Sequence, residues 1–151
     1  MSLENEVKQP KFRNNRHRAV VNVLFTYSNV ASRLQKILNS YNLTLQQFNI
    51  LRILRRQYPE PACNCTLRDQ MFDARSDVTR IVDRLIKENL VMRDHCTHDR
   101  RKVNITITSK GLNILKDMDP LNEQMDGVMA SLTEQELSEL NRLLDKIRNS
   151  H

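Results

Sequence analysis

The stretch SDVTRIVDRLIKENLVMRDHCTHDRRKVNITITSKG, residues 76–111, combines two patterns that together decide the fold. Its first half has the spacing of an amphipathic helix. At about 100° per residue, the apolar side chains gather on one side: Val78, Ile81, Val82, Leu85 and Ile86. The opposite side is basic and carries Arg80, Arg84 and Lys87. The pattern predicts a helix with one buried face and one cationic face, which ends where Asn89 takes the left-handed conformation.

The second half of the stretch predicts a β-hairpin with a charged tip. Residues 103–107 alternate apolar and polar side chains, which is typical of a half-buried strand. Another extended run begins at Leu90, and the sequence Asp99-Arg100-Arg101-Lys102 lies between the two runs. The hairpin would therefore hold these charged side chains away from the body of the protein, where they can touch a partner.

The residues upstream predict one long helix and then shorter ones. From residue 16 to 41, apolar side chains form two adjacent stripes, so the apolar face is unusually wide. We expect one stripe to pack on the protein's own body and the other on a second subunit; packing within one chain is the alternative. Thr44 with Gln47 forms a capping box for the next helix, which must end near Tyr58 because Pro59 follows. Thr66 is the predicted N-cap of a brief further helix.

The C-terminal residues return to a helical pattern after Gly111. Apolar side chains recur at spacings of three and four through residue 132, and Thr133 with Glu136 forms a second capping box. A final apolar stripe follows: Leu137, Leu140, Leu144 and Ile147. Apolar helices thus flank the hairpin unit at both ends, and we interpret them as a shared dimerisation layer.

Composition and charge narrow the class of protein. The sequence has only two glycines in 151 residues and no glycine-rich loop, catalytic elbow or zinc-protease motif, so we expect no enzymatic activity. The formal net charge is +6, with the basic excess in residues 1–108. This excess indicates a polyanionic partner such as DNA, and a solvated basic face is the alternative. No apolar run suits a membrane span or a secretory signal, so we expect a cytoplasmic protein without membrane contact.

Two short helices, the second basic on its outer face, followed by a hairpin, form the order of a winged helix-turn-helix. With these elements the chain resembles the multiple-antibiotic-resistance regulator (MarR) family of bacterial transcription regulators, from about Val20 to Ile147. The resemblance rests on four segments in this order: LTLQQFNILRIL, SDVTRIVDRLIKENLV, DRRKVNITITSKG and SLTEQELSELNRLL. It implies a mainly α fold with a small β-hairpin wing, in which N- and C-terminal dimerisation helices flank the winged helix-turn-helix.

The expected domain organisation is a flexible basic arm at residues 1–15 and a single MarR-like domain at residues 16–151. Within that domain, residues 16–42 and 112–151 are the expected dimerisation helices, and residues 43–111 are the expected DNA-binding lobe. The resemblance implies a homodimeric, sequence-specific regulator of transcription: a ligand-responsive repressor on a pseudo-palindromic operator of double-stranded DNA.

The resemblance also implies which residues contact DNA. The expected set at the recognition helix is Arg75, Ser76, Asp77, Thr79, Arg80 and Arg84, and the wing contributes Asp99 and Arg101. Arg75 and Asp77 at the helix start depart from the usual pattern, as does Asn89, where a glycine is common. An arginine at the wing gains from the electronegative minor groove, and a carboxylate two residues earlier can hold its guanidinium in place. For the basic helix face, a solvated surface is the alternative.

Three cysteines, Cys63, Cys65 and Cys96, raise the question of thiol chemistry or a metal site. Their spacing offers no second pair for a structural zinc site, so we expect reduced thiols and neither a metal nor a cofactor. The family's fold implies that the segment before the brief helix pairs with the wing, which would place Cys65 and Cys96 on one small sheet. The alternative function is a dimeric redox- or metal-responsive sensor or interaction module in which DNA binding is secondary or lost.

The resemblance implies, finally, a small apolar or phenolic effector. Such a ligand would bind between the dimerisation helices and the winged lobe, at Tyr27, Ala31 and Phe48. Ordinary core packing of these three side chains is the alternative.

Overall fold

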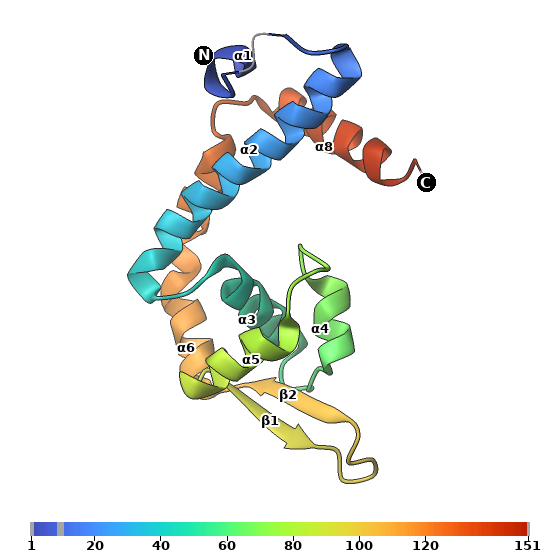
Figure 1. The fold of residues 1–151 in the computed structure, drawn as a ribbon. Coiled ribbons are helices and arrows are strands. Elements are labelled where there is room, and N and C mark those ends of the chain that lie inside the picture. The colour runs from blue at the N-terminus through green and yellow to red at the C-terminus, as the bar shows by residue number, and fades with distance from the viewer. Residues whose placement is uncertain (1, 9–10, 151) are drawn as a thin grey trace.

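Helices from both ends of the chain lie together on one side of a lobe that carries the hairpin (Figure 1). The computed structural model describes residues 2–8 and 11–150. Its α-helices and strands are α1 (Leu3–Glu6), α2 (Asn15–Leu38), α3 (Leu45–Gln57), α4 (Asn64–Gln70), α5 (Val78–Lys87), β1 (Val91–His95), β2 (Val103–Ile107), α6 (Ser109–Met118), α7 (Asn122–Asp126) and α8 (Glu134–Arg148). Short 3-10 turns follow α2, α6 and α7: Asn39–Tyr41, Asp119–Leu121 and Gly127–Met129. The predicted mainly helical fold with a hairpin wing is confirmed.

Local capping signals set the ends of the long helices. Thr44 accepts a hydrogen bond from the backbone N–H of Gln47 at 3.1 Å, and the Gln47 side chain accepts one from the backbone N–H of Thr44 at 2.9 Å. This capping box starts α3, which ends at Gln57 with Tyr58 as its C-cap, directly before the proline. Thr133 and Glu136 form the same reciprocal arrangement at α8. Both predicted capping boxes are confirmed.

The brief helix α4 begins differently from the prediction. Its N-cap is Cys63, whose sulfur accepts from the backbone N–H of Thr66 at 3.2 Å, so the helix starts at Asn64 and Thr66 lies within its first turn. Thr66 as N-cap is therefore wrong. Helix α5 starts at Val78 with Asp77 as its N-cap, and the residue after its C-cap, Asn89, has φ 58°, the left-handed conformation predicted for it.

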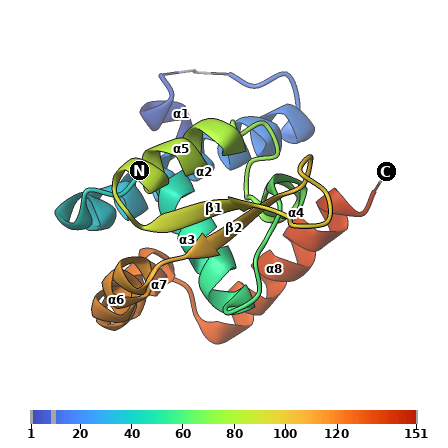
Figure 2. The same cartoon turned by 90° about the horizontal axis from the view of Figure 1, so that it is seen from below.

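The wing is an antiparallel pair of strands in which Val91 lies opposite Ile107 and His95 opposite Val103. Ala62 adds one residue to this sheet, because it exchanges two backbone hydrogen bonds of 2.8 Å with Ile105. Seen from below, the hairpin crosses α3, on which β2 packs (Figure 2). Gly111 closes the base: a Cβ there would lie 2.5 Å from the carbonyl oxygen of Leu90.

The hydrophobic core lies in the winged lobe. It combines side chains from α3 to α6, both strands and the end of α2, and its fully buried members include Leu38, Leu51, Leu54, Leu67, Leu85 and Ile105. Helix α6 contributes Leu115 and Met118 to this core. The first residues of the segment expected as C-terminal dimerisation helices, 112–118, thus belong to a helix that packs on the lobe.

The terminal segments are less buried. The helical run predicted after Gly111 is interrupted at Pro120 by the 3-10 turn Asp119–Leu121. None of the residues of α8 is buried, and within the segment expected as an arm the structure has the one-turn helix α1, with Leu3 buried. Large apolar side chains stay exposed on α2 and α8: Val20, Val23, Leu24, Tyr27, Leu143 and Ile147. Across the described ranges 2–8 and 11–150, no helix has the length and apolar character required to span a membrane.

Candidate nucleic-acid interface

Helix α5 separates its buried and exposed faces as its sequence pattern requires. Val78, Val82 and Leu85 are buried in the core, whereas Thr79, Arg80, Asp83, Arg84 and Lys87 are exposed. The outer face is therefore cationic at Arg80 and Arg84, one helical turn apart. A helix with such a face can enter the major groove of DNA, where arginine contacts both phosphates and base edges.

The residues just before α5 are organised by two carboxylates. Asp73 accepts from the backbone N–H of Arg75 at 2.9 Å, and its carbonyl accepts from the N–H of Ser76 at 3.0 Å. Asp77 accepts from the backbone N–H of Arg80 at 3.2 Å. The carboxylate of Asp77 thus caps the helix, while the side chain of Arg75 is exposed beside the helix start.

Helix α4 touches the outer face of α5 through one side-chain contact. The Asn64 side-chain N–H₂ donates to the Thr79 hydroxyl over 3.4 Å. The side-chain oxygen of Asn64, Oδ1, is buried without a hydrogen-bond partner among the described residues. Asn64 could not be identified from the sequence, because its contact with Thr79 depends on how helices α4 and α5 cross. Asparagine beside a helix cap is also too common a pattern to single out.

At the wing tip, Asp99 organises the turn that presents Arg101. Its carboxylate accepts from the backbone N–H of Arg101 at 3.0 Å and lies 3.7 Å from the Arg101 Nε. Its carbonyl accepts from the N–H of Lys102 at 2.9 Å, and the Lys102 carbonyl closes the hairpin by accepting from Cys96. The Arg101 side chain is 95% exposed. The predicted pair is thus brought together, with the carboxylate fixed to the backbone and the guanidinium in solvent.

An ion pair joins the recognition helix to the wing. Arg93 on β1 donates to Asp83 on α5 over 2.5 Å. At the base of the hairpin, the Lys110 ammonium donates to the Glu88 carbonyl at 2.9 Å and the Thr108 hydroxyl donates to the Asn89 carbonyl at 2.7 Å. Sequence reasoning missed Arg93, because its partner is fixed by the strand position relative to α5 and not by spacing. Helix α5 and the wing therefore form one connected unit.

The expectation that the cysteines are reduced thiols is corrected for two of them. Cys63 and Cys65 form a disulfide, with a Cα–Cα distance of 5.3 Å, so reduced thiols are wrong for these two residues. Two residues apart at the start of α4, they bring their sulfur atoms within bonding reach. Cys65 lies on α4 and not on the sheet with Cys96, although Ala62 does pair with β2. Cys96 is free and partly buried, and the described part of the chain holds no group of three or more potential metal ligands.

The effector residues predicted from the resemblance do not share one hollow. Phe48 is buried and lines a cavity of about 180 Å³ with Leu34, Leu38, Leu45 and Met125, between α2, α3 and α7. Tyr27 is exposed and borders a much smaller hollow beside Leu45 and Phe72.

Comparison with known proteins supplies the family context of this geometry. The sequence model of the MarR family matches residues 43–103. The HTH-type transcriptional regulator MgrA of Staphylococcus aureus is 30% identical over 112 residues, which cover 74% of each protein. The crystal structure of a MarR transcription factor from Planctomyces limnophilus is 32% identical with a TM-score of 0.66, over 89% of this chain and 98% of that one. A mutant MarR from E. coli complexed with operator DNA shares the fold, with a TM-score of 0.76 at 22% identity over 97% and 99% of the two chains.

Proposed function

Because the chain belongs to the MarR family of DNA-binding transcription regulators, we propose that it is a homodimeric repressor of a pseudo-palindromic operator. Its relatives are named as transcription regulators and not as enzymes. We place its action in the cytoplasm, where a bacterial regulator meets the chromosome. The alternative of a sensor that has lost DNA binding is not favoured by these relatives.

The observation that carries the proposal is the shared exposure of α5 and the wing tip. Arg80 and Arg84 point outward from α5, the Arg101 side chain is 95% exposed, and the ion pair between Asp83 and Arg93 links the two elements. A recognition helix in the major groove with an arginine wing at the neighbouring minor groove or backbone fits this arrangement. The remaining residues proposed to contact DNA lie on or beside α5 and the wing tip: Arg75, Ser76, Asp77, Thr79 and Asp99.

The unpartnered apolar faces of α2 and α8 support the homodimer. Val20, Leu24 and Tyr27 on α2 are 58%, 64% and 63% exposed, and Ile147 on α8 is 60% exposed. A monomer would leave this apolar surface in water, whereas a two-fold interface buries it against its own copy. We propose residues 16–41 and 121–147 as the interface. Sedimentation at micromolar concentration should give a dimer, and a monomer there would contradict the assembly.

Binding of the purified protein to fragments of its own upstream region tests DNA recognition. We expect one fragment to bind far more tightly than a shuffled fragment of the same composition, with affinity falling steeply as salt rises because phosphate contacts release counterions. Footprinting of that fragment should show two half-sites about 34 to 36 Å apart, one helical turn. Equal binding to the shuffled fragment at every salt concentration would contradict a sequence-specific regulator.

The apolar cavity beside Phe48 supports a small apolar or phenolic effector at the junction of helices and lobe. A ligand there would touch α2 and α3 together, and it can shift the lobes only through different affinity for their two arrangements. Phenols of increasing size should release the operator in proportion to their occupancy of the cavity. Phe48→Trp, whose larger side chain reduces the space in the cavity, should weaken that release while leaving operator affinity intact.

A further inference from the structure

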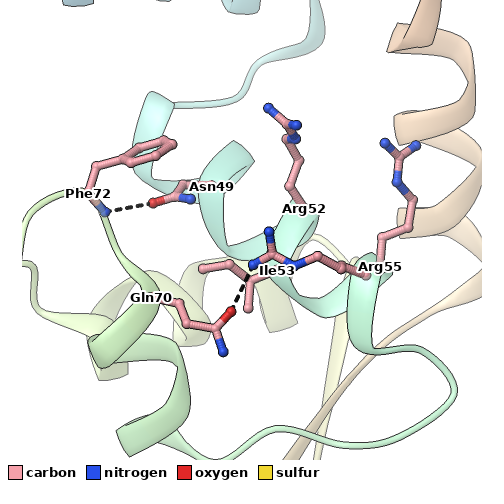
Figure 3. Close-up of a pocket in the computed structure, with 7 residues that line it drawn as sticks. Asn49, Arg52, Ile53, Arg55, Gln70 and Phe72 are labelled. Atoms are coloured by element: carbon pink, nitrogen blue, oxygen red, sulfur yellow. Dashed lines mark hydrogen bonds between the residues drawn. The ribbon is translucent and has the colours of Figure 1, made fainter. Parts of the chain in front are cut away.

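Helix α3 has a second hollow, which faces α4 and whose lining is basic (Figure 3). Its volume is about 470 Å³, within the roughly 300–1,000 Å³ typical of sites for small molecules. The side chains that line it include Asn49, Arg52, Arg55, Arg56, Gln70 and Phe72. No residue of α2 or α8 belongs to this lining, so the hollow is built within the winged lobe.

Two of the guanidinium groups in this hollow have no carboxylate to offset their charge. Arg55 pairs with Asp119 over 2.8 Å. Arg56 donates instead to the neutral Gln70 side chain over 2.8 Å, and Arg52 lies over the Phe48 ring, 5.6 Å from its centroid. Neither Arg52 nor Arg56 forms an ion pair within the described residues. The hollow therefore carries an excess of two positive charges.

A buried amide adds a neutral donor to the two cations. Asn49 is 6% exposed, and its carbonyl oxygen accepts from the backbone N–H of Phe72 at 3.1 Å. Its N–H₂ group has no acceptor in the part of the chain that the structure describes, and Figure 3 shows this nitrogen on the side of Asn49 away from Phe72. A ligand oxygen in the hollow can accept from it in place of solvent.

We propose that this hollow binds a small organic dianion, either a phosphate ester or a dicarboxylate. Arg52 and Arg56 would offset its two charges, because planar guanidinium groups match phosphate and carboxylate oxygens with paired N–H donors. The Asn49 N–H₂ group donates a further hydrogen bond. The Phe72 ring, 79% exposed at the rim, offers apolar surface to the rest of the ligand. This hollow adjoins the cavity beside Phe48, with which it shares Asn49, Arg52 and Phe72, but Arg55, Arg56 and Gln70 line the hollow alone. Ligand binding there does not depend on DNA binding.

Calorimetry on the full chain in phosphate-free buffer tests the site with three aromatic probes. Phenyl phosphate and phthalate present the two kinds of dianion, and phenol presents the same ring without charge. We expect at least one of the dianions to bind with one molecule per chain and phenol to give no saturable heat. Binding of only one of the two dianions would show whether the hollow takes a phosphate ester or a dicarboxylate. Absence of binding by both dianions, or equal binding of phenol, would overturn the proposal.

A double variant locates the binding. Arg52→Gln/Arg56→Gln should raise the Kd of the dianion at least tenfold, with an unchanged circular dichroism spectrum because both side chains are exposed. Lys36→Gln/Lys116→Gln removes the same charge from exposed positions outside the hollow and should leave the Kd unchanged. Equal weakening by both double variants would mean non-specific attraction and overturn the assignment. No DNA is present, so this result is independent of operator binding.

Discussion

Asp83 of the recognition helix and Arg93 of the wing meet in an ion pair of 2.5 Å, although helix and strand are separated by a turn of the chain. Both side chains are partly exposed, at 50% and 30%. The pair therefore fixes the position of the wing relative to α5 more than it stabilises the fold. It is the only ion pair between α5 and β1 in the described ranges.

A double-mutant cycle should measure this coupling as small. Asp83→Asn, Arg93→Gln and the double variant should give an interaction energy of about 0.2 to 1 kcal/mol in urea unfolding, as is usual for exposed pairs. The coupling should weaken at high salt because exposed charges are screened. Strict additivity of the two single variants at low salt would show that the pair contributes nothing.

The wing arginine should matter for DNA and not for folding. Arg101→Ala should weaken operator binding by about 1 to 3 kcal/mol, because its exposed guanidinium is free to contact the minor groove or phosphate. Thermal unfolding and sedimentation should stay as in the wild type. Asp99→Ala should lose part of the same energy, since the carboxylate both orders the turn and faces Arg101. Simple addition of the two losses would mean that the residues act separately.

The recognition helix should separate affinity from specificity. Arg80→Ala should reduce operator affinity by about 1 to 3 kcal/mol and relax the preference for particular bases where the side chain reaches a base edge. Lys87→Ala, on the same face but at the end of the helix, is the matched control and should change affinity less. Binding of Arg80→Ala that equals wild type on both operator and shuffled DNA would favour the solvated-face interpretation.

The base of the wing should not tolerate a side chain at Gly111. Gly111→Ala should destabilise the protein by about 1 to 3 kcal/mol, because its Cβ would lie 2.5 Å from the Leu90 carbonyl oxygen and 2.7 Å from an Ile107 side-chain carbon. Gly127→Ala is the control: nothing lies within 4 Å of its Cβ, so this variant should be neutral or slightly stabilising. Similar unfolding midpoints for both variants would contradict the close approach.

The N-terminal helix α1 should give a pH-dependent contribution to stability. The hydrogen bond from Arg18 to Glu4, 2.8 Å long, lowers the pKa of Glu4 from 4.5 to about 2. Because the folded pKa is the lower one, the stabilisation is present above about pH 4.5 and is lost as the pH falls through 2. Glu4→Gln should therefore unfold at a lower temperature than the wild type at pH 6, and the difference should close towards pH 2. A difference that persists unchanged at pH 2 would exclude this ionisation as its cause.

Features that depend on neighbouring residues could be predicted from the sequence. The capping box of Thr44 and Gln47 and the left-handed Asn89 follow from spacings of one to three residues and are present. Pro120 carries an equally local signal, a break in the helical run, which the apolar spacing concealed. Cys63 was missed as a cap because sulfur is a weak acceptor that capping rules omit.

Features that depend on the crossing of elements could not be predicted. The outward face of α5 follows from its periodicity, but the contacts of that face with Asn64 and Arg93 arise only once α4 and β1 are placed against it. The basic hollow on α3 is of the same kind. Arg52 and Arg56 are one turn apart in the sequence, yet the concave shape depends on α4 and on the position of Phe72.

Because of the bridge between Ala62 and Ile105, the two strands of the wing differ in how readily they can pair with a strand of another molecule. Ala62 pairs with the outer side of β2 at Ile105, whereas the outer side of β1 has no such neighbour among the described residues, so β1 is the more open edge of the sheet. An open edge is a template for intermolecular β-pairing, which proteins suppress with charged side chains. β1 carries Arg93, Asp94 and His95 in succession. These charges discourage strand-to-strand aggregation and leave the apolar helices as the surface through which copies of the chain can join.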